Sequence, residues 1–138
     1  MHGKDGDAPS GGYGVTPGYE EELDRVLALH EQDSPLGHIR KYELVKGDAV
    51  RTFERYLEDN PALVVALAYF DFDLYSPTRR CLELLKGCLT KGSVVCFDQL
   101  NNKAFPGETL ALKEVFGLDG QALRRSPLGT YQSYFVVE

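Results

Sequence analysis

Two apolar runs, separated by polar segments, dominate the middle of the chain. Residues 62–70 are apolar at nearly every position, which is typical of a central parallel strand covered on both faces. Residues 93–97 form a second run of the same kind. Elsewhere apolar residues recur every three or four positions, which indicates amphipathic helices. In chain order the pattern predicts a helix over 19–30, a strand over 42–45, a helix over 48–60, a strand over 62–70, a helix over 76–87, a strand over 93–97, a helix over 106–117 and strands over 122–125 and 131–137.

Residues that favour helix ends lie where this pattern places them. Asp48 is a good N-cap residue, and Pro61 follows the end of the same helix. Ser76 and Pro77 suit the first turn of the helix after the first apolar run. The alternation of strands and helices predicts an α/β fold with a mostly parallel sheet. The last two strands are so close in sequence that we expect an antiparallel pair at the sheet edge.

Length and composition indicate one domain with a short extension. A chain of 138 residues, 43% of them hydrophobic, is long enough to bury one core. Residues 1–18 are rich in glycine and are predicted to form a flexible arm or lid. Residues 19–138 then form the α/β domain.

The charge pattern argues against several classes of partner. The net charge is −6 and no stretch is dense in Lys or Arg, so we expect neither nucleic acid nor an anionic membrane as a partner. No apolar run approaches the roughly 20 residues that span a bilayer. Cys81, Cys88 and Cys96 are odd in number and lie in apolar settings, which favours reduced core residues in a cytoplasmic protein.

Acidic residues follow both apolar runs. Asp71 and Asp73 come directly after the first run, and Asp98 follows the second. Ligands of open α/β sheets bind beyond the carboxyl ends of the strands, so these acids are candidates for a metal site or for acid–base chemistry. The alternative is that they cap helices and face water, as acids at strand ends often do.

A specific resemblance rests on the same region. The segment Asp71 to Thr78 reads Asp-Phe-Asp-Leu-Tyr-Ser-Pro-Thr, and Lys91 to Asp98 and the Pro-Gly-Glu starting at Pro106 follow it. This arrangement resembles the macrocin O-methyltransferase family, which are class I S-adenosylmethionine-dependent enzymes that methylate sugar hydroxyls with a magnesium ion. The resemblance covers about residues 42–138. It implies a Rossmann-like class I methyltransferase sheet and a small-molecule hydroxyl acceptor, a sugar or other natural product.

The resemblance also assigns roles to individual residues. The family's metal-binding acids fall on Asp71 and Asp98, and its catalytic base falls on Asp73. Its third metal ligand, normally an acid, falls on Gln99, whose carbonyl oxygen still coordinates magnesium but carries no charge. The turn containing Asp48 resembles the family's contact near the adenine of the cofactor.

One feature of the family is missing from this sequence. Class I methyltransferases carry an acid-x-Gly-x-Gly loop after the first strand and an acid after the second, and no such pair of elements exists here. The chain therefore matches the C-terminal two-thirds of the catalytic domain and lacks its first two strands, so binding of S-adenosylmethionine is expected to be weak or lost. Two functions follow: a truncated magnesium-assisted O-methyltransferase, or a non-catalytic remnant that acts through self-association as a homo-oligomer.

Overall fold

The computed structural model describes residues 3–6, 14–129 and 131–138. Most helices and strands fall where the sequence pattern places them, and the α/β class is confirmed. The elements are α1 (Tyr19–Gln32), α2 (Ala49–Asp59), β1 (Val65–Phe70), α3 (Tyr75–Leu85), the short 3-10 helix η1 (Lys86–Cys88), β2 (Leu89–Phe97), α4 (Gly107–Val115), β3 (Arg124–Arg125) and β4 (Ser133–Val136).

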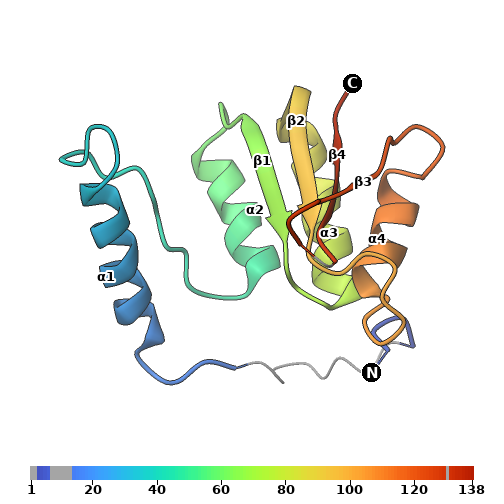
Figure 1. Cartoon of the computed structure of the whole chain (residues 1–138), viewed down its shortest axis with the longest axis horizontal. Helices are drawn as coiled ribbons and strands as arrows, with labels where there is room; N and C mark the ends of the chain where they lie inside the picture. The colour runs from blue at the N-terminus through green and yellow to red at the C-terminus, as the bar shows by residue number, and fades with distance from the viewer. Residues whose placement is uncertain (1–2, 7–13, 130) are drawn as a thin grey trace.

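The strands form one mixed sheet in the order β1-β2-β4-β3 (Figure 1). β1 and β2 run parallel, whereas β4 pairs antiparallel with both β2 and β3. The predicted antiparallel pair at the C-terminus is therefore confirmed, with β3 at the edge. The sheet is mixed rather than mostly parallel, because β1 and β2 form the one parallel pair among the described strands.

The predicted strand over residues 42–45 is wrong. The segment is extended but belongs to no sheet. It is tied to α1 instead: the Tyr42 hydroxyl donates to the backbone carbonyl of Asp24 at 3.0 Å, and Arg40 Nη2 donates to the Asp24 carboxylate at 2.7 Å. Figure 1 shows α2 between α1 and the sheet, so this segment passes outside the sheet.

The position of β1 also differs from the expectation. The apolar run was predicted to be a central strand covered on both faces, yet β1 is an edge strand of the described sheet. Leu67 and Tyr69 are 63% and 53% exposed. No described strand lies beyond β1, because the segment 42–45 does not join the sheet there.

The core lies between one face of the sheet and the helices α3 and α4. Side chains alternate between the two faces of a strand, so Val95, Phe97 and Phe135 point to the same side and are fully buried. Leu82 of α3 and Leu112 of α4 are equally buried against them. This core fixes the strand ends and helix starts at which the candidate acids lie.

Part of the predicted arm contacts the domain. The Asp5 carboxylate accepts the backbone N–H of Tyr75 at 2.6 Å, at the start of α3. Lys4 Nζ donates to the Tyr75 hydroxyl at 3.0 Å and pairs with Glu114 of α4. Residues 1–2 and 7–13 of the arm lie outside the described residues, and its role as a flexible arm or lid stays a prediction.

Candidate functional site

The ends of β1 and β2 bring two of the predicted acids together. Tyr69 pairs with Cys96, and the next residues of the two strands are also paired. The backbone N–H of Asp98 then donates to the carbonyl of Phe70 at 3.0 Å, which continues the ladder beyond the strands. Asp71 and Asp98 therefore follow matched positions of neighbouring strands. Burial and then the charge of Asp98 raise the pKa of the Asp71 carboxyl.

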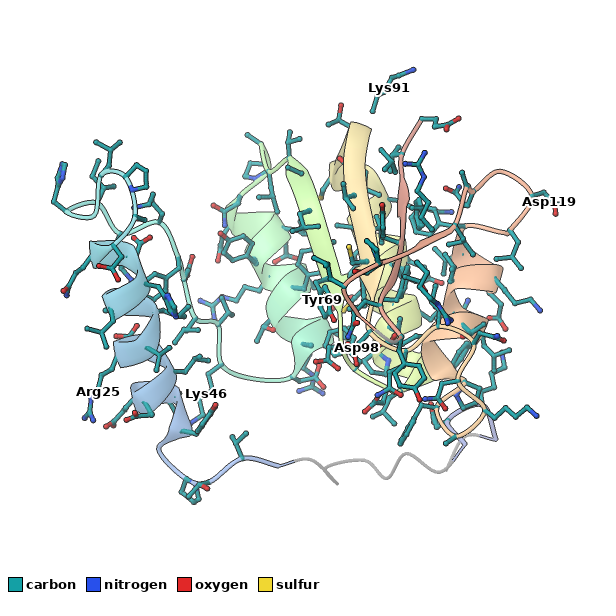
Figure 2. The ribbon with its side chains drawn as sticks, viewed as in Figure 1. Arg25, Lys46, Tyr69, Lys91, Asp98 and Asp119 are labelled. Carbon is teal, nitrogen blue, oxygen red and sulfur yellow. The ribbon has the colours of Figure 1, made fainter. Side chains whose placement is uncertain are left out.

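The carboxylate of Asp98 is held by two side chains. Its Oδ1 accepts the Tyr69 hydroxyl at 2.6 Å and Gln132 Nε2 at 2.8 Å. Figure 2 shows Tyr69 and Asp98 side by side at this end of the sheet. The hydrogen bond to Asp98, followed by burial, raises the pKa of the Tyr69 hydroxyl to about 12. Tyr69 therefore stays a neutral donor at physiological pH and orients the carboxylate.

Asp73 has the least ordinary environment of the three acids. Its φ of 58° lies in the left-handed region, which is uncommon for a residue other than glycine. Its Oδ1 is buried and has no hydrogen-bond partner among the described residues. Burial, then the charges of Asp71 and Asp98, raise the pKa of its carboxyl. A strained residue with an unsatisfied buried oxygen is typical of a functional position.

Close packing of α4 sets the shape of the turn that carries Asp73. A Cβ on Gly107 would lie 2.5 Å from the backbone nitrogen of Tyr75 and closer still to the carbonyl oxygen of Asp73. The first residue of α4 therefore needs to be glycine for the turn to pass over it.

A buried carboxylate that the sequence did not single out connects the two strand-end loops. Glu108 is fully buried at the start of α4. Its Oε1 accepts the backbone N–H of Phe72 at 3.2 Å, and its Oε2 accepts the backbone N–H of Gln99 at 3.0 Å. Burial raises the pKa of Glu108 to about 7, and the hydrogen bonds from Gln99 and Phe72 oppose that shift. In the sequence, Glu108 follows a Pro-Gly helix start and precedes the apolar residues of the helix, which is the one signal that could have pointed to it.

Gln99 lies next to the acids but is already engaged. Its side-chain oxygen accepts Asn102 Nδ2 at 2.9 Å. Across the described residues, no group of three or more His, Cys, Asp or Glu side chains is arranged to hold a metal ion. The structure thus brings Asp71, Asp73 and Asp98 near enough for their charges to interact, without forming a complete set of metal ligands from acids alone.

Asp48 occupies the helix start that the sequence predicted. Its carboxylate accepts the backbone N–H of Arg51 at 3.1 Å, so its role as N-cap of α2 is confirmed. The preceding residue, Gly47, lines a cavity of about 510 Å³. A contact between Asp48 and a cofactor stays a prediction.

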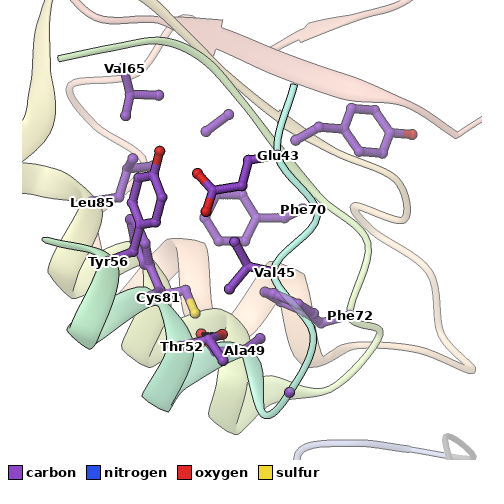
Figure 3. A pocket seen from close by; sticks show the side chains of 14 residues that line it. Glu43, Val45, Ala49, Thr52, Tyr56, Val65, Phe70, Phe72, Cys81 and Leu85 are labelled. Carbon is purple, nitrogen blue, oxygen red and sulfur yellow. Dashed lines mark hydrogen bonds between the residues drawn. The ribbon is translucent and has the colours of Figure 1, made fainter. Parts of the chain in front are cut away.

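This cavity lies along β1, between α2, α3 and the extended segment that precedes α2. Figure 3 shows Glu43 and Val45 of that segment facing side chains of α2 and β1. The lining is mostly apolar and includes residues of both faces of β1, so the cavity reaches the free edge of that strand. The lining residues are Glu43, Val45, Gly47, Ala49, Thr52, Phe53, Tyr56, Val65, Ala68, Tyr69, Phe70, Phe72, Cys81 and Leu85.

Within the described residues no helix is long and apolar enough to cross a membrane. No protein-family model matches the chain, and no curated protein matches it.

Two solved structures match closely. The crystal structure of CalS11, a calicheamicin methyltransferase, is 44% identical with a TM-score of 0.87, and the match covers 94% of this chain and 51% of that one. An apo structure of CalS11, described as a TDP-rhamnose 3'-O-methyltransferase of calicheamicin biosynthesis, is 44% identical with a TM-score of 0.82, and the match covers 89% of this chain and 54% of that one. The chain thus spans about half the length of these proteins. The resemblance is confirmed: the chain belongs to their O-methyltransferase family and represents part of its fold.

Proposed function

We propose that this chain is the acceptor-binding part of an O-methyltransferase that uses S-adenosylmethionine and magnesium to methylate a sugar hydroxyl. The family and the CalS11 description support a nucleotide-linked deoxysugar such as TDP-rhamnose as the acceptor. The observation that carries the proposal is the grouping of Asp71, Asp73 and Asp98 at two adjacent strand ends, with an unpartnered buried oxygen on Asp73.

Asp73 is the proposed base in this site. Methylation of an alcohol requires removal of the hydroxyl proton, and a carboxylate within hydrogen-bond reach of that hydroxyl takes it. Oδ1 of Asp73 has no partner within the described structure, so it is free to accept the proton of an acceptor hydroxyl. The raised pKa of Asp73 makes it a stronger base than an ordinary aspartate.

The chemistry of the neighbouring side chains suits magnesium, which prefers hard oxygen ligands and keeps several waters. Asp71 and Asp98 would hold the ion, with the side-chain oxygen of Gln99 assisting. The mutual repulsion of Asp71 and Asp98, which contributes to the raised pKa of Asp71, would be relieved by a cation. Magnesium, when bound, supplies Lewis acidity that makes a hydroxyl easier to deprotonate. Tyr69 and Gln132 keep the Asp98 carboxylate oriented.

The residues present do not fit S-adenosylmethionine completely. The sequence has no acid-x-Gly-x-Gly loop after a strand and no second strand ending in an acid for the ribose. Asp48 is the one assigned contact, and its carboxylate already caps α2. The methyl-donor side of the site is therefore proposed to depend on elements beyond those that this chain shares with CalS11.

Calorimetry tests the acceptor and metal site directly. We expect MgCl₂ to increase the affinity of the chain for TDP-rhamnose, and Asp71→Ala to remove that increase. Asp119→Ala is the matched control, because Asp119 is an exposed loop acid at the far side of the molecule (Figure 2). Equal magnesium dependence in both variants would contradict the proposal.

The exposed apolar side chains of β1 favour a second candidate, a non-catalytic chain that acts through association. Self-association as a homo-oligomer and a cytoplasmic location both stay predictions. Light scattering of the purified chain measures self-association, and a monomer at high micromolar concentration would contradict it.

A further inference from the structure

Asp73 lies at the centre of a strained backbone turn. Its φ of 58° is left-handed, and the backbone N–H of Leu74 donates to the carbonyl of Phe72 at 2.5 Å, across Asp73. A hydrogen bond between residues i and i+2 around a positive φ is typical of the classic γ-turn, which is rare and strained. Such a turn persists only where the surrounding contacts hold it. The contacts on either side of Asp73 therefore decide where its carboxylate lies.

Two carboxylates from distant parts of the chain hold the residues that flank this turn. On the N-terminal side, Glu108 accepts the backbone N–H of Phe72 at 3.2 Å. On the C-terminal side, Asp5 accepts the backbone N–H of Tyr75 at 2.6 Å. A negative charge at the start of α3 also interacts favourably with the helix dipole. The backbone is thus held by an acceptor both before and after Asp73.

Lys4 holds the side chain of the same residue whose backbone Asp5 binds. Its Nζ donates to the Tyr75 hydroxyl at 3.0 Å, lies 4.1 Å from the centroid of the Tyr75 ring and pairs with Glu114 of α4. An exposed ion pair alone contributes little to stability. Tyr75 is buried, however, so its contacts with Lys4 fix the position of this segment more specifically than the ion pair does.

Gly6 fits residues 3–6 against the loop that leads into α4, as Figure 1 shows. Its φ is 60°, and a Cβ at this position would lie 2.7 Å from Cδ of Pro106 and closer still to the carbonyl oxygen of Ala104. Only glycine allows the two backbones to approach this closely. Residues 3–6 therefore contact α3, α4 and the loop before α4, and these contacts together place the Asp5 carboxylate.

We propose that Asp5 is a positioning residue for Asp73, and that its hydrogen bond to Tyr75 keeps the carboxylate of the base directed at the acceptor hydroxyl. This inference rests on the proposed function, in which Asp73 takes the hydroxyl proton. Asp5 acts through the backbone: it fixes the residue that follows the γ-turn, while Glu108 fixes the residue that precedes Asp73. Without the Asp5 acceptor, the strain at Asp73 is released by a return of its φ to negative values, which redirects the side chain.

Nuclear magnetic resonance of the full chain tests the effect on the turn. A positive φ brings the amide and α protons of one residue close together, so Asp73 should give a strong cross-peak between them in the wild type. We expect Asp5→Ala to remove this cross-peak and to speed hydrogen exchange of the Tyr75 amide about tenfold, in proportion to one lost hydrogen bond. Asp5→Asn is the conservative variant. Its side-chain carbonyl still accepts the N–H, so both observables should return to their wild-type values.

Calorimetry connects the turn with the acceptor. In the presence of MgCl₂, Asp5→Ala is expected to weaken TDP-rhamnose binding about tenfold, whereas Asp5→Asn should bind as the wild type does. Gly6→Ala should reproduce the effect of Asp5→Ala, because its Cβ pushes the segment away from the loop before α4. Gly3→Ala is the matched control, since a Cβ at that position meets nothing within 4 Å. Circular dichroism verifies that each variant folds.

Three outcomes would overturn the proposal. They are an Asp73 cross-peak that survives in Asp5→Ala, an Asp5→Asn variant that behaves like Asp5→Ala, and equal effects of Gly6→Ala and Gly3→Ala. The cross-peak and the amide exchange are measured without the acceptor. A wild-type chain that does not bind TDP-rhamnose would therefore contradict the proposed function, whereas failure of the positioning role would appear in the spectra of the free chain.

Discussion

Glu108 accepts the backbone N–H of Gln99 at 3.0 Å while its other oxygen accepts the N–H of Phe72. One buried carboxylate therefore joins the loop after β1 to the loop after β2, which together carry all three candidate acids. Without it, two half-buried backbone N–H groups would lose their acceptor, at roughly 1 kcal/mol each. The geometry of the acidic site thus depends on a residue that takes no direct part in it.

Glu108 is expected to make stability depend on pH. Its pKa is raised from 4.5 to about 7, so between these values the folded chain binds more protons than the unfolded chain. The contribution of Glu108 to the free energy of unfolding therefore falls as pH rises from about 4.5 to about 7, by at most roughly 3 kcal/mol. Urea denaturation of wild type and Glu108→Gln across this range measures the difference. A wild-type curve parallel to that of the variant would contradict the assignment.

Gly107→Ala is expected to destabilise the fold by more than about 2 kcal/mol, because the new Cβ would overlap the backbone of Asp73 and Tyr75. Gly87→Ala is the matched change, since a Cβ at that position meets nothing within 4 Å. That variant is expected to be neutral or slightly more stable. Thermal denaturation compares the two. Equal melting temperatures would show that α4 does not pack as tightly as described.

Asp73→Asn is expected to stabilise the chain at pH 7 by about 1 kcal/mol, because it removes a charge that is partly buried and is also repelled by Asp71 and Asp98. It also removes the proposed proton acceptor, so any methylation that depends on this site should be lost. Chemical denaturation measures the difference in free energy of unfolding between the variant and the wild type. A less stable variant would indicate that the Asp73 carboxylate is satisfied in a way that the structure does not show.

Tyr69 is expected to ionise near pH 12, and Asp98→Asn should return its pKa toward 10, because the hydrogen bond to Asp98 is the main cause of the shift. Ultraviolet absorbance of phenolate, taken as the difference between each protein and its Tyr69→Phe counterpart, isolates this residue from the other tyrosines. Ionisation of Tyr69 near pH 10 in the wild type would mean that the contact with Asp98 does not form in solution.

The sequence was sufficient to predict where the acids at the strand ends lie. It was insufficient to predict which strands are neighbours in the sheet. Asp71 and Asp98 were predictable because each interrupts a buried apolar run at the end where parallel strands align. The edge position of β1 was not predictable from the sequence. Apolar residues on both faces of a strand show that both faces can be buried, but they do not show that other elements pack on them. The segment 42–45 has strand-like residues, but its hydrogen bonds run to α1 and not to a strand, which local sequence does not reveal.

Glu108 shows a different limit. Acids in the first turn of a helix usually face water and favour the helix dipole. Its burial follows from the close approach of α4 to the turn after β1, which depends on Gly107 and on contacts 36 residues apart in the chain. The role of Glu108 is therefore a tertiary property, whereas the N-cap role of Asp48 is local and was predicted.

The hydrogen bond between Asp5 and Tyr75 makes the N-terminal segment part of the start of α3. Leu74, the residue before α3, has no side chain able to accept a hydrogen bond, and Asp5 supplies that acceptor from 70 residues away. A protease that cut just after Gly6 would separate Asp5 from the rest of the chain, and the hydrogen bond from Tyr75 would be lost. The first turn of α3 would then fray, and the bend that presents Asp73 would lose its anchor, although the cut leaves the whole sheet intact.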